Sequence, residues 1–275
     1  MSIDHEAGRT GEIAWDLYDS GDGVPLVALH GWSDAGGCWS PLVSTWAPGR
    51  SMLTIDARGH GRSRLPDEPF TIEALAADVA AVIRVVLGRP AVVIGHSMGG
   101  LVAEELALAH PELVVALVLE DPAWRVARDV DGLGVPTMLR DGVRAMTGLS
   151  HAELVAGARR ESPAWPTDEL EPWADAKVAL DPRVVQVRHV WDGRDWVESL
   201  ADLTCPVTLL TGQVSLGAIV DAEQVARAAL LLGHRLHHVP LPTGHNVRRE
   251  ARPAVAAVVG EVLAAADAED RGREI

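Results

Sequence analysis

Short apolar runs alternate with longer helical patterns over much of the chain. Residues 12–18 alternate apolar and polar side chains, which is typical of a half-exposed strand. Continuous apolar runs at residues 24–30, 51–56, 90–96 and 114–120 have the length of buried strands, and helical patterns lie between several of them. This order predicts an α/β fold with a mostly parallel, doubly wound sheet.

The pattern changes after Pro122. From residue 124 to about residue 200 no apolar run of buried-strand length occurs, and helical stretches lie between prolines and glycines. Strands and helices then alternate again towards the C-terminus. We therefore predict one α/β core domain of residues 1–123 and 201–275, into which a helical lid (cap) of residues 124–200 is inserted.

Composition and charge restrict the functional class. The 275 residues, 48% of them hydrophobic and 23% charged, fit a soluble globular domain. The net charge of -15 disfavours nucleic acid and anionic membrane as partners, because both select for basic surfaces. The two cysteines give neither a disulfide framework nor a metal-ligand spacing. We therefore predict no metal and no cofactor.

The N-terminal residues carry no sign of export. They lack the basic and apolar regions of a signal peptide, and no apolar run approaches the ~20 residues that span a bilayer. The expectation is a cytoplasmic protein. The sequence does not determine the oligomeric state, so a homo-oligomer stays open.

A strand-to-helix junction carries the clearest chemical signal. Gly95, Ser97 and Gly99 form G-x-S-x-G between an apolar run and a helical pattern. A sharp turn of this kind exposes the serine Oγ, the glycines leave room around it, and the helix N-terminus supplies a partial positive charge. The context predicts Ser97 as a nucleophile; a glycine-rich turn with an idle serine is the alternative.

Two other segments supply partners for this serine. A predicted strand ends at His30 and Gly31, so the backbone N–H of Trp32, together with that of Met98, is placed to hold a developing oxyanion. His30 itself is expected to tie down its loop. His245 follows a late strand and a turn, and it is the candidate general base.

Taken together, these segments resemble the α/β-hydrolase superfamily with an inserted helical lid. The resemblance rests on "HGW" (30–32), "DARGHGRS" (56–63), "GHSMGG" (95–100) and "TGH" (243–245), and it covers essentially the whole chain. It implies a catalytic triad in the chain order nucleophile, acid, histidine. Because the nucleophile position holds serine, epoxide hydrolases and haloalkane dehalogenases of this superfamily are disfavoured.

The position at which most of these relatives carry the acid holds no carboxylate here. After the apolar run that ends near residue 212, the chain has Gln213 and Ser215. Asp221 follows soon after, but with Gln224 three residues later it has the pattern of a helix N-cap in a capping box. Asp221 is therefore an alternative rather than the first candidate.

The preceding strand ends in two adjacent carboxylates. Glu120 and Asp121 must point to opposite sides of the sheet, so only one of them can face His245. Counted without gaps from the nucleophile, Asp121 falls where the pancreatic lipases and the zearalenone lactonases carry their acid. Asp121 is the predicted acid, with Glu120 as the alternative; an aspartate before proline is also a common turn-former.

The resemblance implies a serine hydrolase that cleaves a small-to-medium apolar carboxylic ester or lactone. Trp124, Met138 and Trp191 are the candidate pocket residues, because the predicted lid is rich in tryptophan, although ordinary packing also accounts for such residues. Two alternatives stay open. One is the same triad acting on a C–C or amide bond or in perhydrolysis, and the other is a ligand-binding protein of this fold with slow turnover.

Overall fold

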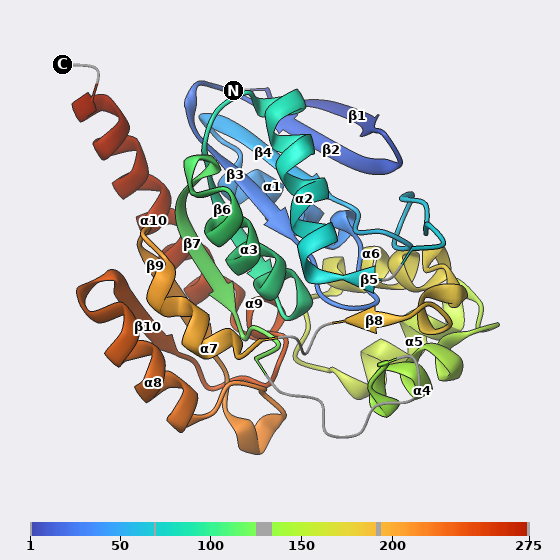
Figure 1. The fold of residues 1–275 in the computed structure, drawn as a ribbon. Helices are drawn as coiled ribbons and strands as arrows, with labels where there is room; N and C mark the ends of the chain where they lie inside the picture. The colour runs from blue at the N-terminus through green and yellow to red at the C-terminus, as the bar shows by residue number, and fades with distance from the viewer. Residues whose placement is uncertain (1, 69, 125–133, 191–193, 274–275) are drawn as a thin grey trace.

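The structure, a computed structural model, describes residues 2–68, 70–124, 134–190 and 194–273. Its main strands are β1 (Asp4–Thr10), β2 (Ile13–Asp19), β3 (Gly23–Leu29), β4 (Arg50–Ile55), β6 (Ala91–His96), β7 (Val114–Glu120), β9 (Val207–Thr211) and β10 (Leu236–Pro240). Within the described ranges, these eight strands form one sheet in the order β1-β2-β4-β3-β6-β7-β9-β10 (Figure 1). From β4 to β10 all neighbours pair in parallel, whereas β2 pairs antiparallel with β1 and β4.

This sheet confirms the predicted mostly parallel α/β fold. The inner strands β3, β6 and β7 coincide with continuous apolar runs, because helices cover them on both faces. The edge strand β1 was not predicted. Most of its side chains are exposed, so its sequence carries no apolar pattern.

Helices cover both faces of the sheet (Figure 1). One face is covered by α2 (Ile72–Val82), α3 (Met98–Ala109) and α8 (Ala222–Leu232), and α2 continues into the π-helical η2 (Ile83–Leu87). The other face is covered by α1 (Val43–Trp46), α9 (Val247–Glu250) and α10 (Arg252–Arg273). Consecutive strand residues enter opposite cores: Leu26 belongs to one and Val27 to the other. The connections contain the 3-10 segments η1 (Gly36–Leu42), η3 (Pro111–Leu113), η6 (Val214–Leu216) and η7 (Gly233–Arg235).

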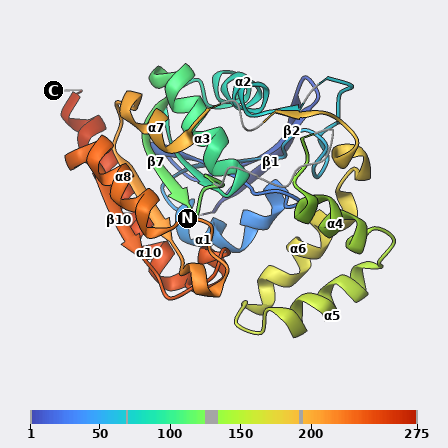
Figure 2. The ribbon, with the colours of Figure 1, turned by 60° about the horizontal axis from the view of Figure 1, so that its bottom comes forward.

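Between β7 and β9 the described part of the chain is mainly helical. It contains α4 (Thr137–Met146), α5 (His151–Glu161), α6 (Thr167–Ala179), η4 (Pro182–Val185), β8 (His189–Val190), α7 (Trp196–Ser199) and η5 (Leu200–Asp202). Figures 1 and 2 show α4, α5 and α6 gathered on one side of the molecule. The short strand β8 pairs in parallel with β5 (Phe70–Thr71), which joins this segment to the core. In the described ranges no helix combines the length and the apolar character needed to cross a membrane.

The parallel strands bring their carboxyl ends to one edge of the sheet. There β3 leads to His30, β6 to Ser97 and β7 to Asp121, and the chain after β10 leads to His245. Open α/β sheets bind their ligands outside this edge, so the candidate residues that lie far apart in the sequence meet where a site is expected.

Candidate active site

Ser97 lies in a strained turn between β6 and α3. Its backbone has φ 53° and ψ -115°, a conformation that residues other than glycine rarely adopt. The flanking glycines are required by space: a Cβ on Gly95 would lie 2.1 Å from the carbonyl oxygen of Gly99, and one on Gly99 would lie 2.3 Å from that of Leu29. The turn therefore holds Ser97 at the start of a helix, as the G-x-S-x-G pattern predicts.

Asp121 is the candidate carboxylate that the structure brings to His245. The Nδ1 of His245 lies 2.6 Å from Oδ2 of Asp121, whose side chain is fully buried. Asp121 also accepts hydrogen bonds from the backbone N–H groups of Ile219, at 2.8 Å, and Val220, at 3.1 Å. Its own φ of 39° is again rare for a non-glycine residue. Three donors thus orient this carboxylate.

The loop after β9 therefore supports the acid without supplying it. Ile219 and Val220 belong to this loop, and they donate N–H groups to Asp121. Asp221 caps α8 and forms a capping box with Gln224, as the sequence predicts. In the described residues, no hydrogen bond or ion pair joins Gln213, Ser215 or Asp221 to His245.

Glu120 points to the other side of β7 and holds the segment that follows His245. It accepts a 2.7 Å hydrogen bond from the backbone N–H of Arg248, and it pairs with the guanidinium of Arg248 at 3.3 Å. Burial raises the pKa of Glu120, and Arg248 opposes this shift. The two adjacent carboxylates thus do different work: Asp121 contacts the histidine ring, and Glu120 anchors the start of α9.

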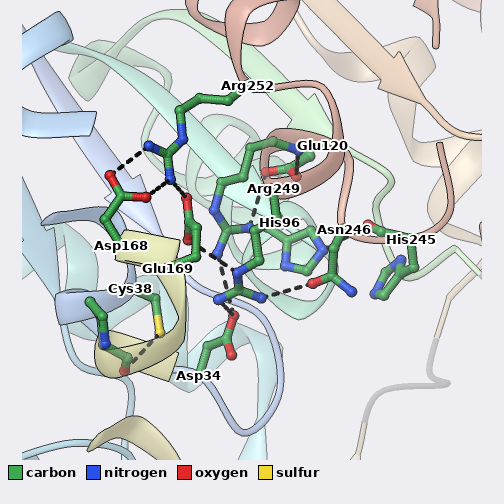
Figure 3. Close-up of polar contacts among 12 residues, drawn as sticks. Asp34, Cys38, His96, Glu120, Asp168, Glu169, His245, Asn246, Arg249 and Arg252 are labelled. Carbon is green, nitrogen blue, oxygen red and sulfur yellow. Dashed lines mark hydrogen bonds and ion pairs between the residues drawn. The ribbon is translucent and has the colours of Figure 1, made fainter. Parts of the chain in front are cut away.

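A largely buried ion cluster lies behind the site, and Figure 3 shows part of it. Its members come from the loop after β3, from the end of β7, from α6, from α9 and from the start of α10: Asp34, Glu120, Asp168, Glu169, Lys177, Arg248, Arg249 and Arg252. Burial alone would raise the pKa of Asp34, but Arg249, Lys177 and Arg248 hold it well below its usual range. The cluster ties the helical segment between β7 and β9 to the core.

His96, the residue before the nucleophile, contacts the candidate base. Its Nε2 donates to the carbonyl oxygen of His245 at 3.0 Å, and the two ring centroids are 4.7 Å apart. Burial and the neighbouring His245 hold the pKa of His96 well below its usual range, so its ring is neutral. Ser97 and His245 line the same cavity, although within the described residues no hydrogen bond joins them. Such bonds often form only once substrate binds.

The backbone of Gly31 and Trp32 lies against the nucleophile. A Cβ on Gly31 would be 2.7 Å from Nδ1 of His96 and 3.1 Å from Cβ of Ser97, so only glycine fits there. As expected, His30 ties down this loop: its Nδ1 donates to the carbonyl oxygen of Gly31 at 2.8 Å, and its Nε2 accepts from the N–H of Ala57. The candidate oxyanion donors, Trp32 and Met98, thus lie on the two backbone segments that flank Ser97.

These residues open onto a cavity of about 1460 Å³. Its walls come from the loop after β3, from α4 and α6, and from α8, and its apolar or aromatic lining includes Trp32, Trp124, Leu139, Met146, Trp165, Trp173 and Leu230. Of the predicted pocket residues, Trp124 is buried in the wall and Met138 lines the cavity with 71% of its surface exposed. Trp191 lies outside the described residues.

Two buried residues in this region were not predicted. Glu104 of α3 accepts hydrogen bonds from the indole N–H of Trp124, at 2.9 Å, and from Oγ of Ser199, at 2.6 Å. Burial raises its pKa to about 8. Lys177 of α6 lines the cavity with only 3% of its side chain exposed. A signal for Lys177 existed in the sequence, because it is the only lysine in the chain.

Over the part of the chain that the structure describes, no group of three or more His, Cys, Asp or Glu side chains is arranged to hold a metal ion.

Comparisons with known proteins identify the family. The model of the alpha/beta hydrolase family matches residues 26–258. The chain is 32% identical over 248 residues to the Lipase LipV of Mycobacterium tuberculosis, which covers 85% of this chain and 91% of that protein. The chain therefore belongs to the α/β-hydrolase family, and a lipase relative along most of its length supports hydrolase activity.

Two further similarities support less, one because it covers a short part of the relative and the other because its sequence identity is low. The chain is 39% identical over 118 residues to the sn-1-specific diacylglycerol lipase ABHD11 of Xenopus tropicalis, but this match spans 42% of the chain and only 37% of that relative. The enol-lactonase from Burkholderia xenovorans LB400 superimposes with a TM-score of 0.71 at 21% identity, covering 92% of this chain and 96% of that one. The second similarity supports the fold.

Proposed function

We propose that this protein is a serine hydrolase that cleaves an apolar carboxylic ester or lactone with Ser97, His245 and Asp121 as its triad. The observation that carries the proposal is the 2.6 Å contact between His245 and the buried Asp121, beside a cavity that both His245 and the strained Ser97 line. A carboxylate at Nδ1 leaves Nε2 of the histidine free to accept a proton, which is what a serine nucleophile needs.

The reaction follows from these positions. Ser97 Oγ bonds to the substrate carbonyl carbon while its proton passes to Nε2 of His245, and the carbonyl electrons become an oxyanion. Collapse of this intermediate breaks the ester C–O bond, and His245 returns the proton to the leaving alkoxide. Water then attacks the acyl-enzyme with the same base, which releases the acid and restores Ser97.

The oxyanion would be held by backbone N–H groups. Met98 begins α3, so its N–H belongs to the positive end of the helix, and the N–H of Trp32 projects from the loop that lies against Ser97. Asp121 stabilises the imidazolium that forms on His245.

The cavity supports an apolar substrate and, through its volume, one of medium or larger size. Small-molecule sites usually enclose about 300–1,000 Å³, and this cavity has a volume of about 1460 Å³. Described residues of the predicted cap line this cavity, and we assign to Trp165 and Trp173 among them the contact with the acyl or alcohol group. The enol-lactonase and lipase similarities make lactones and lipid-like esters the first substrates to test.

A fluorophosphonate probe together with a panel of p-nitrophenyl esters and lactones tests the proposal. We expect stoichiometric labelling of Ser97 and steady turnover of at least one substrate, both abolished in Ser97→Ala. Labelling without turnover on esters, but with turnover on amides or C–C substrates, would move the reaction to another bond. Saturable ligand binding without labelling or turnover would mean a ligand-binding protein, and the proposed function would be wrong.

A further inference from the structure

Lys177 stands apart from the other basic residues of the chain. It is the only lysine among the 24 lysine and arginine residues. It lies on α6, in the helical segment between β7 and β9, yet only 3% of its side chain is exposed. An ammonium group that is buried must be held by specific partners, because desolvation of a charge is costly. Its partners therefore indicate its role.

The ammonium of Lys177 reaches across to the loop after β3. Its Nζ donates to the carbonyl oxygen of Ser33 at 2.7 Å and to Oδ1 of Asp34 at 2.7 Å. Nζ also lies 4.9 Å from the ring centroid of Trp173. We name residues 31–34 the oxyanion loop, because the N–H of Trp32 lies within it. Lys177 thus joins α6 to the backbone of the oxyanion loop.

The oxyanion loop is a tight turn whose peptide groups are connected in series. The N–H of Asp34 donates to the carbonyl oxygen of Gly31 at 3.1 Å, which closes the turn. Ser33, at its centre, has a φ of 61°, a strained value for a residue other than glycine. The carbonyl of Ser33 and the N–H of Asp34 share one peptide group, and the carbonyl of Gly31 and the N–H of Trp32 share another.

Two hydrogen bonds and the two peptide groups between them link Lys177 to Trp32. This chain of contacts runs from the Lys177 ammonium to the Ser33 carbonyl, from the Asp34 N–H to the Gly31 carbonyl, and ends at the N–H of Trp32. A positive charge on a carbonyl oxygen polarises its peptide group and strengthens the N–H at the other end, and hydrogen bonds in series reinforce one another. The chain also fixes the plane of each peptide.

We propose that Lys177 is a positioning residue for the oxyanion hole: through two peptide groups it orients and polarises the N–H of Trp32. This inference rests on the proposed function, because the N–H of Trp32 has a role only if attack by Ser97 creates an oxyanion. Lys177 does not touch the reacting atoms. A lysine suits the place because its compact ammonium offers three donors to oxygens in different directions, whereas a planar guanidinium does not.

Removal of this ammonium should leave the fold intact. Asp34 also pairs with Arg249 at 2.9 Å and with Arg248 at 3.3 Å, so its carboxylate keeps two cations in a Lys177→Met variant. The methionine fills nearly the same volume as the lysine stem. The variant loses the hydrogen bond to the Ser33 carbonyl, which is the link that the proposal requires.

A purely structural role for Lys177, as a tie between α6 and the core, needs a matched control. Arg252 of α10 binds the same helix through Asp168, at 2.7 Å, and Glu169, at 2.7 Å, and does not contact the oxyanion loop. In Arg252→Gln, Glu169 keeps its contact with Arg249. Each variant removes one of the contacts between α6 and the core, but only Lys177→Met removes the hydrogen bond to the oxyanion loop.

The experiment measures kcat and KM on the best ester, and the inhibition constant of a trifluoromethyl ketone that mimics its acyl part. The ketone adds to Ser97 and places an anionic oxygen in the oxyanion hole. For Lys177→Met we expect kcat to fall roughly 5- to 50-fold, less than the ~10²–10³ for loss of a whole donor. The ketone should weaken by a similar factor, while KM and the melting temperature stay near wild type. Arg252→Gln should leave kcat and the ketone affinity unchanged.

Other results would overturn the proposal. Lys177 would have another role if kcat were unchanged in Lys177→Met, or if kcat fell equally in Lys177→Met and Arg252→Gln. The same would hold if only KM rose in Lys177→Met. If Lys177→Met does not fold, Lys177→Leu, which also has no hydrogen-bond donor, is measured in its place with the same expectation. A wild-type protein that hydrolyses nothing would refute the proposed function itself, whereas an active wild type with an unaffected variant would refute only this inference.

Discussion

Replacement of Asp121 by asparagine tests the assignment of the acid most directly. The carboxylate accepts three hydrogen bonds: His245 and Ile219 donate to Oδ2, and Val220 donates to Oδ1. Asparagine has one acceptor and one NH₂ group, so it cannot accept at both positions. With NH₂ towards His245, the proton moves to Nε2 of the ring and the base can no longer accept the proton of Ser97. With NH₂ towards Val220, two donors face each other.

The structure also gives the size of the effect. Asp121 is fully buried and its Oδ2 lies 2.6 Å from Nδ1 of His245, so the imidazolium that forms during reaction loses a close anion in the variant. Two unit charges about 4 Å apart interact by about 4 kcal/mol at an effective dielectric constant of 20. At about 1.4 kcal/mol per decade this is roughly a 10³-fold loss, and the wrong tautomer adds to it, so kcat should fall roughly 10³–10⁴-fold.

The assay is the steady-state hydrolysis of the best ester by three variants with the same chemical change. Asp121→Asn, Glu120→Gln and Asp221→Asn each convert a carboxylate to an amide. Glu120 holds Arg248 and Asp221 caps α8, so these two variants should lose some stability but far less kcat. If Asp121→Asn kept a rate near wild type while either of the others collapsed, the reasoning about the acid would be refuted.

Three further outcomes are expected. Ser97→Ala should fold normally and lose hydrolysis by a factor on the order of 10⁴ or more, and labelling of this variant by a serine-directed phosphonate would contradict the assignment. Burial raises the pKa of Glu104 from 4.5 to about 8, so the folded protein keeps a proton that the unfolded chain loses. Wild-type stability should therefore fall between about pH 4.5 and pH 8 relative to Glu104→Gln, by a few kcal/mol, and parallel pH profiles of the two melting temperatures would be evidence against this. Trp124→Phe removes the hydrogen bond to Glu104 and part of the cavity wall, so kcat/KM should change unequally for short and bulky esters; a uniform change would mean a structural role.

Local features of the chain were predictable because neighbouring residues determine them. The apolar runs became the inner strands, and the capping box of Asp221 and Gln224 formed as its spacing predicts. The strained turn at Ser97 could be predicted from the glycines around it, because a Cβ at Gly95 or Gly99 would clash with neighbouring backbone atoms. The edge strand β1 escaped prediction, because its exposed faces require no apolar residues.

The sequence by itself determined the inner strands of the sheet, the strand-to-helix turn that carries Ser97 and the three carboxylates that could contact His245. Asp121 was chosen because the usual position of the acid holds no carboxylate and because of a resemblance to other hydrolases. The sequence did not show which groups hold Asp121 in place, since the backbone N–H groups of Ile219 and Val220 lie 98 and 99 residues away along the chain. The contact of Lys177 with Ser33 spans 144 residues. Backbone donors and buried ion pairs of this kind leave no periodic pattern, because they depend on where loops meet after the sheet has formed. Only the tertiary structure decided which of the possible partners face one another.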